Sequence, residues 1–229
     1  MNILVINGSP RGEGNTMKLT RAFLQGAGWG DAEIIDLSKI KVAGCNGCFS
    51  CWEATPGKCV IDDDMTEILP KIIAADVMIT SFPLYSCYFP GQLSCFMNRM
   101  LPISLPFMDK EAESGGHPSR YDLSKQRQFS ISTCGFWTAE GNYDVIIKLF
   151  ERAGAVNHRE FSIFCGQGGL FEMPDTAELV EPYLALVRKA GAEFAAGGIS
   201  EELQKLLAEP ILPREEYERG ADEAWEVAE

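Results

Sequence analysis

The stretch of residues 8–16 carries side chains that could hold a phosphate group. It reads Gly-Ser-Pro-Arg-Gly-Glu-Gly-Asn-Thr, and it lies between an apolar run at 2–7 and a helical pattern that starts at Lys18. The N-terminus of a helix leaves backbone N–H groups unpaired and carries a partial positive charge. The loop adds side-chain donors and one guanidinium, from Ser9, Asn15, Thr16 and Arg11. It therefore predicts a phosphate cradle; the alternative is an ordinary strand-to-helix turn with a polar cap.

Two common phosphate loops do not match this stretch. A nucleoside-triphosphate loop needs G-x-x-x-x-G-K-[ST], but Glu13 stands five residues after Gly8 and no lysine precedes Thr16. A dinucleotide loop needs G-x-G-x-x-G, but Met17 takes the place of the third glycine. The remaining interpretation is a loop rich in hydroxyl and amide groups that holds one terminal phosphate, as the flavodoxin-like fold holds FMN.

Four of the eight cysteines cluster in the sequence at Cys45, Cys48, Cys51 and Cys59. The first three stand at C-x2-C-x2-C spacing on one short turn, and the fourth can fold back across Pro56-Gly57. Such a set suits a [4Fe–4S] cluster. Zinc bound by four thiolates, or thiols that bind no metal, are the alternatives. We expect the scattered cysteines to pack as small apolar groups; these are Cys87, Cys95, Cys134 and Cys165.

Two motifs together resemble a known family. Gly8-Ser-Pro-Arg followed by Gly14-Asn-Thr16 resembles the flavin loop of the NAD(P)H-dependent FMN reductase family. The cysteine motif followed by Asp62-Asp63 resembles the iron-sulfur flavoprotein branch of that family, and the likeness covers most of residues 1–195. The resemblance implies that the four clustered cysteines ligate a [4Fe–4S] cluster. It also implies a homodimer or homotetramer with the flavin close to a subunit interface, which the apolar stretch 101–108 supports weakly.

Five apolar runs alternate with helical patterns along the chain. Strands are expected at 2–7, 32–37, 76–82, 128–133 and 157–164, and helices at 18–26, 65–73, 91–100, 143–150 and 179–194. This alternation predicts an α/β fold, a flavodoxin-like doubly wound parallel sheet with strand order 2-1-3-4-5. The cysteine loop, 41–62, is expected as an insertion after the second strand. Residues 1–198 are expected to form the FMN-binding domain, and 199–229 an acidic helical C-terminal extension.

In such a sheet the loops after strands 1, 3 and 4 meet where ligands bind. We expect the first to hold the phosphate and the other two, 83–90 and 133–141, to flank the isoalloxazine ring. The expected ring-side residues are Pro83, Leu84, Tyr85, Ser86, Thr133, Gly135 and Phe136. Core packing is the alternative for the aromatic side chains. No catalytic side chain is assigned, because hydride transfer to flavin N5 belongs to the cofactor.

The composition limits the class of partner. A net charge of −13 argues against nucleic acid and anionic membranes. No apolar run is long enough to span a bilayer, no leader precedes the first strand, and the clustered cysteines suit a reducing compartment, which together predict a cytoplasmic location. The expected function is an FMN-dependent oxidoreductase that passes reducing equivalents from NAD(P)H or a ferredoxin-like donor to an unidentified small-molecule or protein acceptor. A non-catalytic electron carrier and a zinc-stabilised interaction module are the alternatives.

Overall fold

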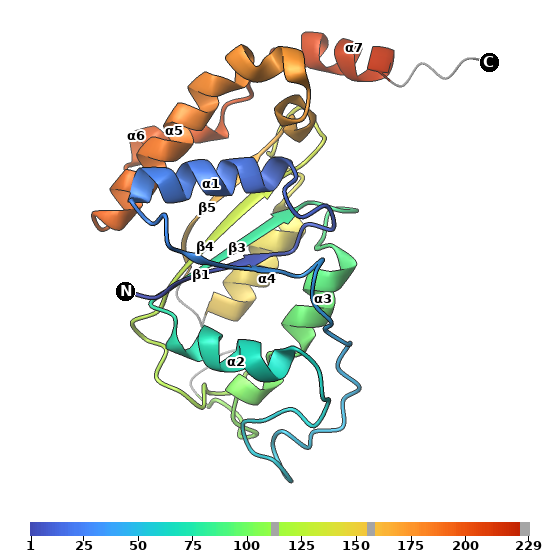
Figure 1. The fold of residues 1–229 in the computed structure, drawn as a ribbon, viewed down its shortest axis with the longest axis vertical. Coiled ribbons are helices and arrows are strands. Elements are labelled where there is room, and N and C mark those ends of the chain that lie inside the picture. Colours follow the sequence, from blue (N-terminus) through green and yellow to red (C-terminus); the bar gives the residue numbers. More distant parts are fainter. Residues whose placement is uncertain (111–114, 155–158, 225–229) are drawn as a thin grey trace, which may run out of the picture.

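A computed structural model describes residues 1–110, 115–154 and 159–224 of the chain. It has one parallel sheet of five strands in the order β2-β1-β3-β4-β5, which confirms the predicted topology (Figure 1). The strands are β1 (Ile3–Asn7), β2 (Glu33–Asp36), β3 (Val77–Pro83), β4 (Arg127–Thr133) and β5 (Arg159–Cys165). The helices are α1 (Asn15–Ala27), α2 (Met65–Ala74), α3 (Gly91–Asn98), α4 (Asp144–Gly154), α5 (Ala177–Ala195), α6 (Glu201–Ala208) and α7 (Arg214–Ala224). Short 3-10 turns lie at Leu101–Ile103, Gly168–Phe171 and Pro174–Thr176.

The central strands are apolar over their whole length because helices cover both faces of the sheet. Every residue of β1 is buried. Val5 lies between Ile34 of β2 and Ile79 of β3, and each of these neighbours runs parallel to β1. The continuous apolar pattern therefore predicted a buried parallel strand correctly.

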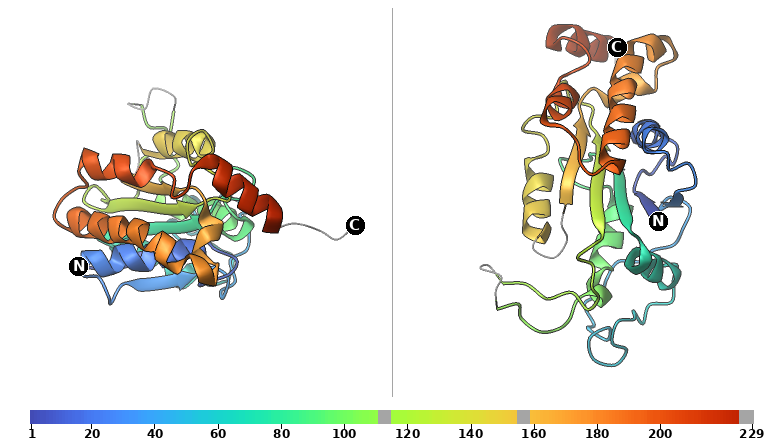
Figure 2. Two further views of the ribbon diagram at one scale, coloured as in Figure 1. Left: turned by 90° about the horizontal axis from the view of Figure 1, so that it is seen from above. Right: turned by 90° about the vertical axis from the view of Figure 1, so that its left-hand side faces the viewer.

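Two helical layers sandwich the sheet (Figures 1 and 2). Helices α1, α5 and α6 share one apolar core with one face of the sheet, and α2, α3 and α4 share the second core with the other face. Helices α1 and α5 pack backbone to backbone through Gly26 and Gly191. A Cβ added at Gly26 would overlap the Arg188 carbonyl, and one at Gly191 would overlap the Phe23 carbonyl. Only glycine permits this close approach.

Helix α1 begins at Asn15, three residues before the predicted start at Lys18. The difference arises because the first turn is polar yet buried: Asn15 is 8% exposed and Thr16 is 2% exposed. The apolar periodicity that marks the helix in the sequence starts only at Leu19. The other described elements agree with the prediction to within a few residues, and residues 157–158 of the expected fifth strand lie outside the described part.

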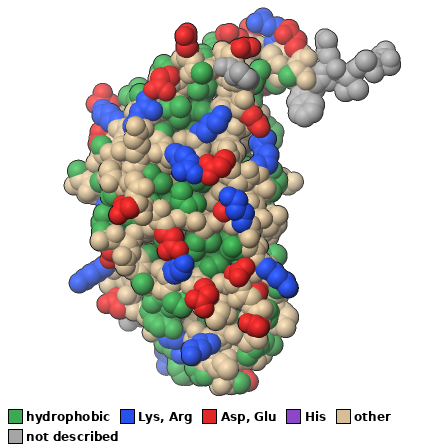
Figure 3. All heavy atoms as spheres, viewed as in Figure 1, with side chains coloured by type: hydrophobic (Ala, Val, Ile, Leu, Met, Phe, Trp, Pro, Cys, Tyr) green, Lys and Arg blue, Asp and Glu red, His purple; other side chains and the backbone are tan. Residues whose placement is uncertain are grey.

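The C-terminal helices continue from the body of the fold. In α6, Leu203 and Leu207 are buried in the same core as α5, and the Tyr183 hydroxyl donates a hydrogen bond to the Leu207 carbonyl at 2.9 Å. The boundary expected at residue 198 stays a prediction. Acidic and basic side chains are interspersed on the face seen in Figure 3, so no single-sign patch forms there. No helix in the described residues has both the length and the apolar character needed to cross a membrane.

Candidate functional site

The loops that follow β1, β3 and β4 meet at the carboxyl edge of the sheet. The backbone N–H of Gly8 donates to the Ser81 carbonyl at 2.8 Å, and that of Leu84 donates to the Thr133 carbonyl at 2.8 Å. The hydroxyls of Thr16 and Thr133 are 2.6 Å apart and hydrogen-bonded to each other. The structure therefore brings the three loops singled out in the sequence into one place, where doubly wound sheets bind ligands.

Asn7, the last residue of β1, shapes the first of these loops. Its side-chain amide donates to the Gly12 carbonyl at 2.9 Å, and its side-chain oxygen accepts from the backbone N–H of Ser9 at 3.1 Å. Asn7 is 1% exposed, and both polar ends of its side chain are used inside the loop. The sequence analysis counted Asn7 only as a strand residue. A polar side chain at the end of an otherwise apolar strand was the signal for this role.

The N-terminus of α1 leaves hydrogen-bonding groups unused. Its N-cap residue is Gly14, which has no side chain to cap the first N–H groups of the helix. The Oδ1 atom of Asn15 is buried and has no hydrogen-bond partner among the described residues. Buried polar atoms are nearly always paired in folded proteins. Unsatisfied N–H groups suit phosphate oxygens, and a free acceptor suits a ribityl hydroxyl, so these groups fit the polar tail of FMN.

Arg11 does not stand free in this loop, because it pairs with Glu172. Its Nη1 atom lies 2.7 Å from Oε2 of Glu172, and each side chain is 55% exposed. The amide of Asn15 also reaches that carboxylate, at 3.4 Å. The Glu172 carboxylate thus already accepts hydrogen bonds from Arg11 and Asn15, two residues that were expected to hold a phosphate.

The two other loops present their aromatic side chains to the surface. Tyr85 is 45% exposed and Phe136 is 51% exposed, so core packing does not account for them. Ser86 and Cys87 lie between Tyr85 and Tyr88 in a tight turn with positive φ angles of 49° and 57°, and the two tyrosines pair through both backbone hydrogen bonds.

This turn also corrects an expectation for the scattered cysteines. Cys87 is exposed at the tip of the turn and is not packed inside. Cys134 and Cys165 are buried as expected. Strain of the kind that Ser86 and Cys87 carry concentrates at binding sites, and here it lies beside the expected ring-side residues Pro83 and Leu84.

Helix α7 reaches back to the loop after β4 through Tyr217. The Tyr217 hydroxyl donates to the Gly135 carbonyl at 2.8 Å, and the Arg214 guanidinium lies 5.3 Å from the centre of the Trp137 ring. Gln167, fully buried, donates from its side chain to the carbonyls of Trp137 and Leu212.

The four clustered cysteines line one small hollow beside the end of α3. Cys45 and Cys48 are exposed, Cys59 is partly buried and Cys51 is buried. Hydrogen bonds from the side chain and backbone of Ser50 lower the pKa of Cys48, whereas burial, and then the charge of Cys59, raise the pKa of Cys51. The fold therefore brings together the four cysteines that cluster in the sequence.

The geometry of these thiols differs from that of a site for one ion. Within the described residues no three His, Cys, Asp or Glu side chains are placed to hold a metal ion. The hollow measures about 20 Å³, little more than the space that one water molecule occupies. The donor set itself, four thiols with two on the open side, matches the chemistry of an iron-sulfur cluster.

The segment after α3 covers one side of the cysteine loop. The indole Nε1–H of Trp52 donates to the Ser104 carbonyl at 3.0 Å. The ring of Trp52 lies 4.8 Å from that of His117 and 5.2 Å from that of Phe49. The ring of His117 therefore packs against the cysteine loop through Trp52.

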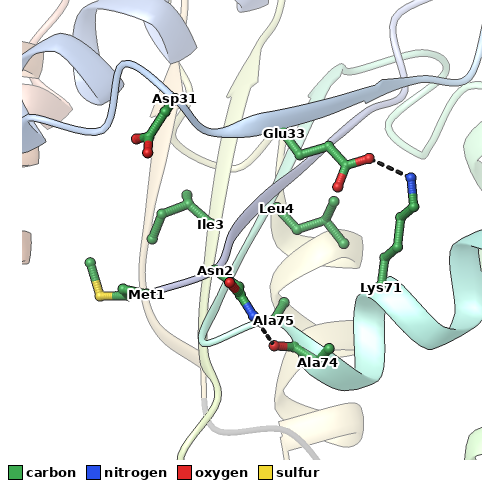
Figure 4. A pocket seen from close by; sticks show the side chains of 9 residues that line it. All are labelled: Met1, Asn2, Ile3, Leu4, Asp31, Glu33, Lys71, Ala74 and Ala75. Carbon is green, nitrogen blue, oxygen red and sulfur yellow. Dashed lines mark hydrogen bonds and ion pairs between the residues drawn. The ribbon is translucent and has the colours of Figure 1, made fainter.

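A larger hollow lies at the opposite edge of the sheet and is a poor candidate for the cofactor site. It measures about 420 Å³ and is lined by the start of β1 and by residues of α2, with Lys71 paired to Glu33 (Figure 4). Ligands of doubly wound sheets bind outside the carboxyl ends of the strands. This hollow lies at their amino ends.

The strand order and the meeting of loops at the carboxyl edge define a flavodoxin-like protein. Residues 1–114 match the family model described as NADPH-dependent FMN reductase, and the chain belongs to this family. An iron-sulfur flavoprotein of Methanocaldococcus jannaschii is 38% identical over 117 residues, which are 50% of this chain and 60% of that protein. An iron-sulfur flavoprotein of Methanosarcina thermophila is 38% identical over 102 residues, 43% of this chain and 52% of that protein. The matches thus span about half to three fifths of these relatives.

Solved structures share the fold at low sequence identity. An FMN-dependent NADH-azoreductase of Bacillus anthracis, solved with FMN, has a TM-score of 0.60 at 18% identity and covers 85% of this chain and 100% of its own. An NAD(P)H:quinone oxidoreductase of Methanothermobacter marburgensis has a TM-score of 0.62 at 14% identity and covers 85% of this chain and 96% of its own. These likenesses establish the flavodoxin-like fold and leave the activity open.

Proposed function

We propose that this protein is an FMN-dependent oxidoreductase that takes reducing equivalents from NAD(P)H or a ferredoxin-like donor and passes them to an acceptor. The observation that carries the proposal is the uncapped N-terminus of α1, with the buried and unpaired Oδ1 of Asn15, at the point where three loops meet. Membership of the NADPH-dependent FMN reductase family supports it. FMN, when bound, supplies the hydride chemistry at its N5 atom.

The residues of the chain would then bind and orient the cofactor. Backbone N–H groups of the first loop, with the side chains of Ser9, Asn15 and Thr16, hold the phosphate and the ribityl chain. Arg11 joins them if it leaves Glu172. The ring-side residues are Pro83, Leu84, Tyr85, Ser86, Thr133, Gly135 and Phe136. The exposed faces of Tyr85 and Phe136 suit contact with a flat ring.

We infer that Cys45, Cys48, Cys51 and Cys59 hold a [4Fe–4S] cluster, which would add one-electron transfer to the two-electron chemistry of a flavin. The shared hollow supports this assignment, as do the names of the relatives from two archaea. Zinc is the weaker candidate, because zinc sites usually pair two C-x2-C motifs and Cys59 has no neighbouring cysteine. The cysteine loop as an insertion, the homodimer or homotetramer and the cytoplasmic location stay predictions.

The test is anaerobic purification followed by an absorbance spectrum, analysis of released flavin, and assays for iron, sulfide and zinc. We expect about one FMN and about four irons per chain, and bleaching of the flavin bands when NADH or NADPH is added. Bound FMN that is not bleached by NADH or NADPH, and that shuttles electrons between protein partners without turning over an acceptor, would favour the electron carrier. Zinc without flavin would refute the proposal in favour of an interaction module.

A further inference from the structure

Arg99 is a buried cation beside the four cysteines. It follows the last residue of α3, its side chain is 1% exposed, and it lines the same hollow as Cys45, Cys48, Cys51 and Cys59. A buried charge is tolerated only when anions and hydrogen bonds compensate it. The acceptors of its five N–H donors therefore decide whether this charge is compensated.

Four of the five N–H donors of the Arg99 guanidinium have acceptors. The Nη1 atom donates to Oδ2 of Asp63 at 2.7 Å and to the Ala43 carbonyl at 2.9 Å. The Nη2 atom donates to Oδ1 of Asp63 at 2.9 Å and to the Ile61 carbonyl at 3.5 Å. The fifth donor, Nε–H, is buried and has no partner among the described residues. An arginine carries five donors and no acceptor, so one donor of a buried cation is left for another group.

Cys59 is the cysteine whose charge acts most directly on this guanidinium. Burial disfavours the charged form of Arg99, but the hydrogen bonds to Asp63 and the negative charge of a neighbouring Cys59 thiolate raise the pKa of Arg99 above its ordinary value. Asp63 is equally buried, at 1% side-chain exposure. Although burial opposes its charge, the hydrogen bonds from Arg99 and from the N–H groups of Ala43 and Met65 hold the pKa of Asp63 below its usual range. Both partners are therefore charged at neutral pH.

We propose that Arg99 is a positioning residue of the cysteine site, whose Nε–H donates a hydrogen bond to the Cys59 sulfur and whose fixed charge stabilises the anionic cluster that the four thiolates hold. This inference rests on the cluster assigned under the proposed function. Asp63 fixes the guanidinium by a two-point contact and leaves its Nε edge for sulfur. The pair thus acts on the cluster through one defined donor.

The proposal predicts the direction in which the cluster's reduction potential moves. Hydrogen bonds to sulfur and local charge are the means by which proteins set these potentials. A cation beside the cluster favours the reduced form, which carries one more negative charge. Loss of Arg99 therefore lowers the potential, and loss of the Asp63 charge, which leaves the cation uncompensated, raises it. A purely structural ion pair would not move the potential in opposite directions.

The experiment is an anaerobic redox titration of the cluster in the full chain, followed by absorbance and electron paramagnetic resonance. The variants are R99Q/D63N, which replaces both charges with amides, and D63N alone. Relative to D63N, we expect R99Q/D63N to lower the ratio of reduced to oxidised cluster at a fixed potential at least tenfold, about 59 mV for a one-electron couple, because these two variants differ only in the cation. We expect D63N to raise this ratio. R127K is the control, because Arg127 stacks on Phe194 away from the cysteines, and it should leave the ratio within about twofold of the wild type.

The outcomes separate this inference from the proposed function. Wild-type protein without iron and sulfide would refute the cluster, and the inference with it, before any variant is measured. A cluster that is present in the wild type but whose potential is not raised by D63N, or is the same in D63N and R99Q/D63N, would overturn the inference alone. If R99Q/D63N does not fold, R99K decides: it keeps the charge and loses Nε–H, so an unchanged potential in a folded R99K protein overturns the hydrogen bond to Cys59.

Discussion

Glu172 should weaken FMN binding, and its replacement by glutamine should strengthen it. The Glu172 carboxylate lies 2.7 Å from Arg11 and 3.4 Å from the Asn15 amide, and both of these groups are assigned to the phosphate. A phosphate must displace this carboxylate to reach them. Glu172→Gln removes the competing charge without shortening the side chain.

The magnitude follows from the exposure of the pair. Both partners are 55% exposed, and exposed ion pairs contribute about 0.2–1 kcal/mol. If the upper half of this range is released when Arg11 turns to the phosphate, FMN binds about 2–5-fold more tightly, since about 1.4 kcal/mol is a factor of ten. The gain should shrink as salt rises, because exposed charges are screened.

The assay is a fluorescence titration of the apoprotein with FMN at low and high salt. Glu13→Gln is the control, because Glu13 also forms an exposed ion pair in this loop but with Arg21, at 2.5 Å. The affinity of Glu13→Gln for FMN should change less than that of Glu172→Gln. Unchanged or weaker binding in Glu172→Gln at low salt would show that Glu172 does not compete with the phosphate.

Three further predictions concern packing, pH and the C-terminal helix. Gly191→Ala should destabilise the fold in urea unfolding, because the added Cβ overlaps the Phe23 carbonyl. Overpacking costs about 1–3 kcal/mol, more than the gain of about 1 kcal/mol in helix propensity. Gly198→Ala, where no atom lies near the added Cβ, is the control. Burial raises the pKa of Cys165 from 9.0 to about 12, so its protonated form stabilises the fold fully below pH 9 and this contribution is lost as pH rises toward 12. Between pH 8 and pH 10.5 the free energy of unfolding should therefore fall by about 2 kcal/mol more in the wild type than in Cys165→Ala. Equal losses in the two proteins would contradict this. Tyr217→Phe removes the hydrogen bond to Gly135, which is worth about 0.5–1.5 kcal/mol, and hydrogen exchange in α7 should rise while α5, its internal reference, stays protected.

The sequence was sufficient for the topology because the strands are buried on both faces. Val5, Ile79 and Ile131 are each 0% exposed, and continuous apolar runs of this kind predict a parallel sheet. The start of α1 was placed too late for the opposite reason. Asn15 and Thr16 are polar residues inside a helix, and they break the apolar pattern where the site requires polar groups.

The contacts between distant segments could not be predicted from the sequence. Nothing in the local sequence of Arg99 indicates that it pairs with Asp63. Asp63 also accepts from the N–H of Met65 at 3.2 Å, at the start of α2. Glu172 approaches Arg11 from 161 residues away, and only the packing of the whole domain brings such groups together. The site residues themselves stay predictions until a cofactor is measured.

The glycine contact between α1 and α5 bears on how far the cooperative unit extends. The match to the family model ends at residue 114, yet the apolar side of α1, with Phe23 at its centre, is covered by α5 and by β4 residues that come later in the chain. A fragment that stopped at 114 would leave this side in water and would aggregate or stay unfolded. The two halves of the chain therefore fold as one cooperative unit, joined by the contact of α1 with α5.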